Sequence, residues 1–148
     1  MLLRDFRRAD LEPMWALDQD CFPPGIAYSR SELRAFLSRR TAEAVVAESQ
    51  GRIVAFVLGG RRGRGEGQVI TLDVAAAARR RGLGRTLMVE LERRFRVAGV
   101  TRVRLETAVT NTGAIALYER LGYRKTARRA GYYGPGLHAW TMEKPLGT

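Results

Sequence analysis

The segment that most constrains the fold is a turn of arginine and glycine between a predicted strand and a predicted helix. Residues 77–88 have the sequence AARRRGLGRTLM, which follows a strand pattern in Gln68–Ala75 and opens a helical pattern that continues to Phe95. Glycine lets backbone come close to a ligand, and the first N–H groups of a helix have no partner within it. A strand, a glycine turn and a helix in this order favour an α/β fold that holds an anion at the turn.

The charges and spacing of this turn limit which anion it binds. Three arginines, Arg79 to Arg81, stand where the helix dipole already attracts negative charge. Leu87 occupies the position of the third glycine in a G-x-G-x-x-G dinucleotide fingerprint, and no G-K-[ST] follows. The two commonest nucleotide sites are therefore disfavoured. Taken alone, the segment is also compatible with a solvated basic turn that binds nothing.

The composition narrows the class of protein only in part. The 26 Lys and Arg against 15 Asp and Glu give a formal charge of +11, which predicts attraction to phosphates, nucleic acid or acidic surfaces. Only two of these are lysines, so we give the excess of arginine little weight as a functional signal. The single Cys21 and single His138 exclude a disulfide framework and disfavour a zinc site or a Cys–His catalytic pair. We therefore expect a cytoplasmic protein without a metal. No apolar run reaches about 18 residues, so we expect no membrane partner.

Hydrophobic periodicity predicts one domain, residues 1–148, with a mixed sheet of seven strands and four helices. A Gly- and Arg-rich connector, residues 61–67, is predicted to be a mobile loop. The expected order is strand, two helices, three strands, helix, strand, helix and two strands. The expected strands are 2–6, a hairpin over 43–60 that turns at Gln50-Gly51, then 68–75, 100–109, 123–133 and 137–146. The helices are expected from residue 9 or 10 to about 17, from Ser29 or Ser31 to Leu37, over 83–95 and over 111–122.

A second group of residues with chemical potential lies in LETAVTNTGAIALYERLGY. Asn111, Ala114 and Tyr118 are spaced so that they lie along one side of a helix. The same residues also suit plainer roles, a helix cap for Asn111 and a core stripe for the others. Glu106 shares a strand face with Arg102 and Arg104, which is typical of an ion-paired surface residue.

Together, the segments LDVAAAARRRGLGRTLM and LETAVTNTGAIALYERLGY resemble the GNAT superfamily of acetyl-CoA-dependent N-acetyltransferases. The shared pattern is R-x-x-G-x-G after a strand, then a glutamate on a strand, then N-x-x-A-x-x-L-Y-x-x-x-G-[FY] on a helix. The resemblance implies the GNAT acyltransferase fold over the whole chain, acetyl-CoA as co-substrate and no metal. The predicted order of elements agrees with that fold.

Within the superfamily, the chain is most similar to the RimI-like ribosomal-protein-alanine N-acetyltransferases. The similar features are Cys21-Phe22-Pro23 with Tyr28-Ser29 and Glu32, the pair Tyr132-Tyr133, and the ending AWTMEKPL. The chain departs from the group at His138, where an acidic residue is common, and at L-E-T-A in place of L-E-V-R. These departures bear on the acceptor rather than on acetyl-CoA.

The resemblance implies which residues contact the co-substrate. One strand would separate from its neighbour and pair with the pantetheine arm, the amides of the turn would hold the pyrophosphate, and an asparagine would reach the arm from the next helix. The arginine side chains would add charge-assisted contacts. The implied contacts are Leu72, Asp73, Val74, Arg79, Arg80, Arg81, Gly82, Leu83, Gly84, Arg85 and Asn111.

The resemblance also implies the catalytic roles. Glu106 would act as the base, through water, and Tyr118 would protonate the departing thiolate. The amine would attack acetyl-CoA directly in a ternary complex, so Cys21 is expected to be structural. The acceptor channel would be lined by Phe22, Tyr28, Tyr132 and Tyr133, although the tyrosine pair also suits the edge of a sheet.

Three functions follow from these observations. The first is acetylation of the N-terminal α-amine of a protein, for example a ribosomal protein. The second uses the same fold on a small amine, a free amino acid or a lysine side chain, for which the arginine-rich residues 61–64 and His138 leave room. The third, a basic nucleic-acid-binding module, is disfavoured because the arginines are scattered and lack interleaved aromatic residues.

Overall fold

The computed structural model describes residues 1–147, in which seven strands form one sheet in the order β1-β2-β3-β4-β5-β7-β6. Only β4 and β5 run parallel, and all other neighbours are antiparallel. The arrangement confirms the predicted mixed sheet with four helices. The strands are β1 (Leu2–Asp5), β2 (Ala42–Ser49), β3 (Arg52–Arg62), β4 (Glu66–Val74), β5 (Arg102–Ala108), β6 (Arg124–Gly134) and β7 (Leu137–Pro145), and the helices are α1 (Leu11–Cys21), α2 (Arg30–Leu37), α3 (Leu83–Val97) and α4 (Thr112–Arg120).

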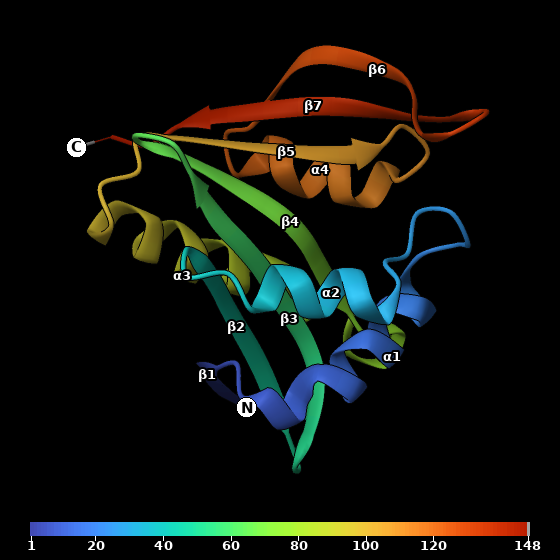
Figure 1. Cartoon of the computed structure of the whole chain (residues 1–148), viewed down its shortest axis with the longest axis vertical. Coiled ribbons are helices and arrows are strands. Elements are labelled where there is room, and N and C mark those ends of the chain that lie inside the picture. Colours follow the sequence, from blue (N-terminus) through green and yellow to red (C-terminus); the bar gives the residue numbers. More distant parts are fainter. Residues whose placement is uncertain (148) are drawn as a thin grey trace.

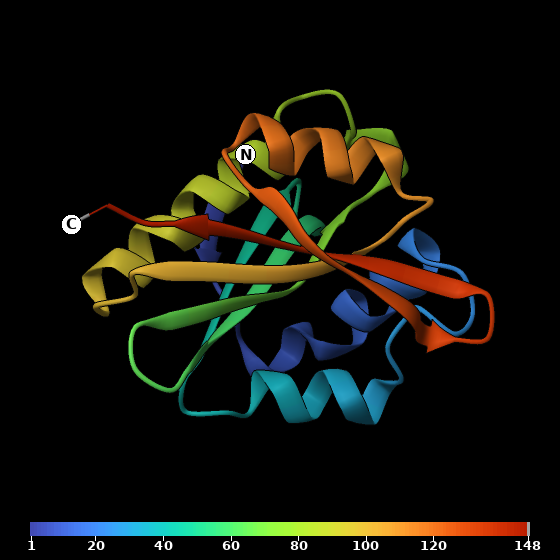
Figure 2. The same ribbon diagram turned by 90° about the horizontal axis from the view of Figure 1, so that it is seen from above.

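Helices cover the two faces of the sheet unequally (Figures 1 and 2). Helices α3 and α4 lie on one face, over a core that includes Leu91 and Phe95. Helices α1 and α2 lie on the other face, where Met14, Leu33 and Phe56 form a second core. This second pair covers only the β2, β3 and β4 part of its face. Among the described residues no helix lies over the same face of β5, β7 and β6, which we call the open face.

Local sequence explains where most elements begin and end. The side chain of Ser29 accepts a hydrogen bond from the Glu32 N–H and starts α2, so of the two predicted starts Ser29 is the right one. Asn111 Oδ1 accepts from the Ala114 N–H at 3.3 Å and starts α4. Gln50 and Gly51 both have positive φ, 53° and 74°, as expected for a tight hairpin turn.

The prediction of a mobile loop over residues 61–67 was wrong. Strand β3 continues through Arg62 and β4 begins at Glu66, so only residues 63–65 form a turn. Gly63 and Gly65 supply the positive φ values, 55° and 69°, that such a turn requires. Pairing with β2 and β5 on either side extends the strands beyond what their Gly- and Arg-rich composition favours.

The parallel pair β4 and β5 separates part of the way along its length. The pairing runs only from Glu66 to Val69 on β4, against Arg102–Leu105 on β5. The register between β3 and β4 shifts at this point, which leaves Ile70 as an extra residue in β4. Such a bulge bends a strand, and beyond it β4 and β5 diverge (Figure 1). One edge of β4 is therefore free of a strand partner beside β5.

Candidate active site

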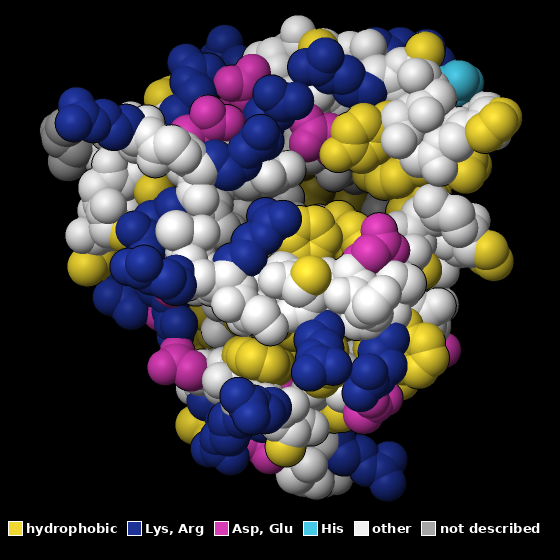
Figure 3. All heavy atoms as spheres, viewed as in Figure 1, with side chains coloured by type: hydrophobic (Ala, Val, Ile, Leu, Met, Phe, Trp, Pro, Cys, Tyr) yellow, Lys and Arg dark blue, Asp and Glu magenta, His cyan; other side chains and the backbone are white. Residues whose placement is uncertain are grey.

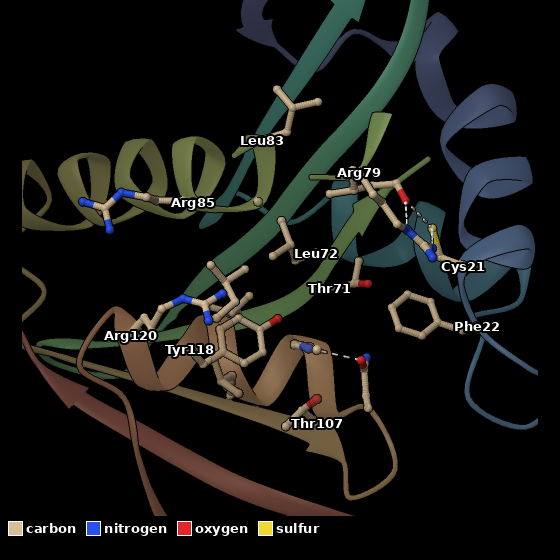
Figure 4. Close-up of a pocket in the computed structure, with 18 of the residues that line it drawn as sticks. Cys21, Phe22, Thr71, Leu72, Arg79, Leu83, Arg85, Thr107, Tyr118 and Arg120 are labelled. Atoms are coloured by element: carbon tan, nitrogen blue, oxygen red, sulfur yellow. Dashed lines mark hydrogen bonds between the residues drawn. The ribbon is translucent and has the colours of Figure 1, made fainter. Parts of the chain in front are cut away.

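A cavity of about 590 Å³ lies between the diverging strands β4 and β5 (Figure 4). Its walls come from β4, β5, the start of α3 and one side of α4. The predicted site residues that line it are Phe22, Leu72, Val74, Arg79, Arg80, Gly82, Leu83, Gly84, Arg85, Glu106, Asn111, Tyr118 and Tyr133. Residues far apart in the sequence thus meet in one place.

The turn before α3 lies at one end of the cavity, and we call it the anion-binding turn because its backbone suits an anion. Arg80 and Gly82 both have positive φ, 66° and 73°, and no side chain caps the helix. Residues of positive φ within a turn bring successive backbone N–H groups toward one point, and the helix dipole adds positive charge there. The side chains of Arg80 and Arg85 lie on the same wall, and Arg120 joins them from α4. Arg120 was not among the predicted residues, because its position at the end of α4 carries no signal of its own.

A glycine sets how closely α3 approaches α4. A Cβ atom added at Gly84 would lie 2.9 Å from Leu117 Cδ2 and 3.6 Å from Leu72 Cδ2. A larger residue would require the Leu117 side chain to shift or the two helices to separate. Gly84 therefore lets the start of α3 and the side of α4 that carries Tyr118 both line one cavity.

Three of the predicted co-substrate contacts lie differently from the rest. The Arg79 Nε donates to the Val74 carbonyl at 3.0 Å, and the guanidinium lies beside Cys21 (Figure 4). Arg81 is exposed and does not line the cavity. Asp73 is fully buried and does not line it either, so only its backbone can face a ligand. The prediction of residues 72–74 as a contact strand stays a prediction about backbone.

Tyr118 lies on the α4 wall with its hydroxyl pointing into the cavity (Figure 4). Its ring packs edge-on against Tyr123, with the ring centroids 5.9 Å apart. Burial raises the pKa of the Tyr118 hydroxyl above its ordinary value, and the nearby charges of Asp73 and Tyr133 raise it further. The hydroxyl therefore carries a proton at neutral pH and can donate it into the cavity.

Glu106 is held in place on β5 at the opposite wall. Its Oε2 accepts from Arg104 Nε and from Thr141 Oγ1, both at 2.9 Å, and its side chain is only 4% exposed. Thr141 Oγ1 in turn accepts from Arg129 Nε at 2.9 Å. The ion pair that the sequence predicted is present. The other oxygen, Oε1, accepts no side-chain hydrogen bond within residues 1–147, so it remains available to a proton donor in the cavity.

The predicted acceptor residues lie at one side of the cavity, which we call its mouth, but Tyr28 and Tyr132 do not line the cavity itself. Phe22 and Tyr133 line it directly. Tyr132 packs edge-on against Tyr133 at 4.8 Å and is 48% exposed. Tyr28 lies behind this mouth, and its hydroxyl donates to the carbonyl of Ile70, the bulge residue, at 3.3 Å. The connection between α1 and α2 is thereby fixed to β4.

A pair of aspartates that sequence analysis did not combine lies beneath the cavity. Asp18 of α1 and Asp73 of β4 are both fully buried. Burial raises the pKa of Asp73 well above its ordinary value, and the hydrogen bond and negative charge of Asp18 raise it further, while a hydrogen bond from Thr71 opposes the rise. Two carboxyl groups that share a hydrogen bond need a proton between them. The Oδ2 of Asp73 has no hydrogen-bond partner among the described residues, and a proton on this carboxyl group would let it donate to Asp18.

Asp18 also fixes the connection between α1 and α2. Its Oδ2 accepts from the Tyr28 N–H at 2.8 Å, while the Thr71 hydroxyl donates to Asp73 Oδ1 at 2.5 Å. Burial and the charge of Asp73 raise the pKa of the neighbouring Cys21 thiol, which keeps the thiol protonated and poorly nucleophilic. Asp18 and Asp73 are 55 positions apart in the sequence, so no local pattern could have joined them.

Two further observations concern other kinds of site. Over residues 1–147, no helix has the length and apolar character needed to span a membrane. Within the same residues, no three His, Cys, Asp or Glu side chains come together as metal ligands would.

A cavity between diverging parallel strands, with the turn before α3 at one end and with Tyr118 and Glu106 in its lining, is a geometry that suits acyl transfer. Comparison with known proteins agrees: the acetyltransferase (GNAT) family model matches residues 11–123. An uncharacterized N-acetyltransferase of Methanocaldococcus jannaschii is 32% identical over 145 residues, which cover 97% of this chain and 91% of the relative.

The N-alpha-acetyltransferase RimI of Mycobacterium tuberculosis is 34% identical over 145 residues, with 95% of this chain and 86% of the relative covered. The crystal structure of Ard1 from Thermoplasma volcanium has a TM-score of 0.91 at 25% identity and covers 99% of this chain and 98% of its own. The chain belongs to the GNAT family of acetyltransferases. The resemblance to the RimI-like group is thereby confirmed.

Proposed function

We propose that this acetyltransferase moves the acetyl group of acetyl-CoA to the N-terminal α-amine of a protein, such as a ribosomal protein, by direct attack in a ternary complex. The observation that carries the proposal is that one cavity joins the anion-binding turn to Glu106 and to a mouth lined by Phe22 and Tyr133. Its relatives named as N-alpha-acetyltransferases support a protein acceptor.

The residues of the cavity fit acetyl-CoA, which GNAT enzymes use. The uncapped N–H groups at the start of α3, with Arg80, Arg85 and Arg120, suit a pyrophosphate. The unpaired edge of β4 beyond Val69 suits an extended arm that adds alongside it like a further strand. Acetyl-CoA supplies the activated thioester.

Glu106 and Tyr118 divide the proton transfers between them. Only a neutral amine attacks a thioester, and an α-amine with a pKa of about 7.7–8.0 loses its proton far more readily than a lysine at about 10.4. Glu106 Oε1 accepts the proton of the amine, directly or through a water molecule. Tyr118 donates its proton to the sulfur that leaves. Cys21 forms no acetyl-enzyme in this mechanism.

We expect peptides with free N-termini to release thiol from acetyl-CoA in the presence of this protein. A matched peptide set tests the proposal: each sequence is made with a free α-amine and no lysine, and with a blocked N-terminus and one lysine. Because the lysine holds its proton more tightly, the free-α-amine peptides should react at least tenfold faster at pH 7. Equal rates for the two forms, or reaction with free amino acids and small amines only, would contradict it.

Two glycine variants separate co-substrate binding from backbone strain. Gly82 and Gly99 have positive φ of 73° and 85°, and a Cβ on either meets no atom within 4 Å. Alanine at either position should lower the free energy of unfolding by about 1 kcal/mol, because L-residues disfavour this backbone. Only Gly82→Ala should weaken coenzyme A binding, about tenfold, because its methyl group enters the anion-binding turn. Calorimetric titration checks this, and equal affinities for the two variants would contradict a pyrophosphate site at the turn.

A further inference from the structure

A group of arginines on the open face lies next to the acceptor mouth. Arg62 of β3, Arg104 of β5 and Arg129 of β6 come from three different strands but belong to the same face of the sheet. Arg62 donates to Gln68, which lies opposite Arg104, and Thr141 links Arg129 to Glu106. Burial and the charge of Glu106 raise the pKa of the Tyr132 hydroxyl, and the three guanidinium groups oppose the rise. Basic side chains accordingly gather beside the hollow at the mouth (Figure 3).

Two of these arginines have no acidic partner. Arg104 is paired with Glu106 at 2.9 Å. Arg62 instead donates to the Gln68 amide oxygen at 3.4 Å, and Arg129 donates to the Thr141 hydroxyl. No carboxylate within residues 1–147 forms an ion pair with Arg62 or Arg129. Their positive charge is therefore available to a ligand.

These arginines lie where the rest of an acceptor chain must pass. In the proposed function the α-amine of the acceptor reaches Glu106, and its following residues leave through the mouth over the open face. Arg104 is two residues from Glu106 on the same strand, a separation of about 7 Å. An extended peptide covers about 3.3 Å per residue, so its second to fourth residues fall within reach of the arginine side chains.

We propose that Arg62 and Arg129 select acceptor proteins with acidic side chains at positions two to four. This inference rests on the proposed function, because it takes the α-amine to be the reacting group. A protein acceptor is favoured over RNA because Glu66, Glu106 and Glu143 stand among the arginines on this face. Those carboxylates repel a continuous phosphate backbone but leave separate places for single carboxylates.

Three sets of peptides test the inference. The sets differ only at positions two to four, which are three glutamates, three glutamines or three lysines. Each set contains versions with Ala, Ser or Met at position one, and no peptide has another charged side chain. At low salt we expect kcat/KM to be about tenfold higher for the glutamate peptide than for the glutamine peptide, and lower again for the lysine peptide. Exposed ion pairs are weak individually, so this preference should shrink at 0.5 M NaCl.

The structure supplies matched control variants on the same two strands. Arg61 and Arg128 are the chain neighbours of Arg62 and Arg129 but belong to the opposite face, because side chains alternate along a strand. Arg62→Glu/Arg129→Glu should reverse the order of the three peptides, whereas Arg61→Glu/Arg128→Glu should keep it. The ratio between peptides is the readout, since it is insensitive to a general loss of activity. If the glutamate pair unfolds, Arg62→Gln/Arg129→Gln should reduce the preference to less than twofold.

The outcomes separate this inference from the function on which it rests. Acetylation of all three free-amine peptides at equal rates, or a preference for lysine, overturns the acidic selectivity and leaves α-amine acetylation standing. A preference that survives in the Arg62 and Arg129 variants overturns the assignment to these residues. Failure of every free-amine peptide to react overturns both proposals.

Discussion

Replacing Tyr118 by phenylalanine is expected to lower kcat by about 100-fold or more while changing the affinity for acetyl-CoA less than twofold. The ring and its edge-on contact with Tyr123 remain, so the variant loses only the hydroxyl that points into the cavity. General acid catalysis contributes about 10²–10⁴-fold, which sets the size of the effect. Steady-state kinetics with a reactive peptide and calorimetric titration with coenzyme A measure the two quantities.

Glu106→Gln should lower kcat in the same way, because an amide still fits between Arg104 and Thr141 but cannot accept the proton of the amine. Tyr123→Phe is the matched control for Tyr118→Phe, because it also removes a single tyrosine hydroxyl. The hydroxyl of Tyr123 donates to buried Glu92 at 2.9 Å and not to the cavity. Its loss should cost about 2 kcal/mol of stability with kcat nearly unchanged. Unchanged turnover in both Tyr118→Phe and Glu106→Gln would remove these residues from the mechanism.

Asp73→Asn should stabilise the protein progressively as the pH rises. In the unfolded chain Asp73 loses its proton near pH 4, whereas in the folded chain its raised pKa keeps the proton to a higher pH. Between these two pH values the folded state holds the extra proton, so the free energy of unfolding of the wild type falls by about 1.4 kcal/mol per pH unit. An asparagine keeps the same shape, accepts from Thr71, donates to Asp18 and does not titrate.

Urea denaturation of the two proteins from pH 4 to pH 9 measures this difference. The gap between Asp73→Asn and wild type should be smallest near pH 4, widen with pH and level off above the raised pKa. Asp20→Asn removes an exposed carboxylate from α1, the helix that carries Asp18, and should leave a nearly constant gap. A constant gap for Asp73→Asn as well would contradict a proton shared between Asp18 and Asp73.

Local sequence patterns predict much of this fold. Alternation and helical spacing predicted the strands and helices in their right order, and short-range chemistry predicted the Asn111 cap and the Gln50-Gly51 turn. The grouping of Glu106 with Tyr118 came from a resemblance between motifs, and the structure brings both residues to one cavity. Their roles in the reaction stay predictions.

What could not be predicted depends on contacts between distant parts of the chain. The composition of residues 61–67 favours a loop, but neighbouring strands extend β3 and β4 into it. Asp18 and Asp73 each belong to an ordinary amphipathic element, and only the packing of α1 on β4 brings the two carboxyl groups together. The charge of Arg62 and Arg129 was visible in the sequence, but their common position on one face of the sheet requires the order of its strands.

The close contact at Gly84 has a consequence for which donors the enzyme accepts. A coenzyme A thioester has a fixed covalent length between its pyrophosphate and its sulfur. The start of α3 packs closely against Leu117 of α4, which restricts the distance from the anion-binding turn to the helix that carries the Tyr118 hydroxyl. The packing of the two helices would therefore select donors by length. A donor with a shorter or longer arm, bound by the same phosphate contacts, would place its reactive carbon too far from the Tyr118 hydroxyl.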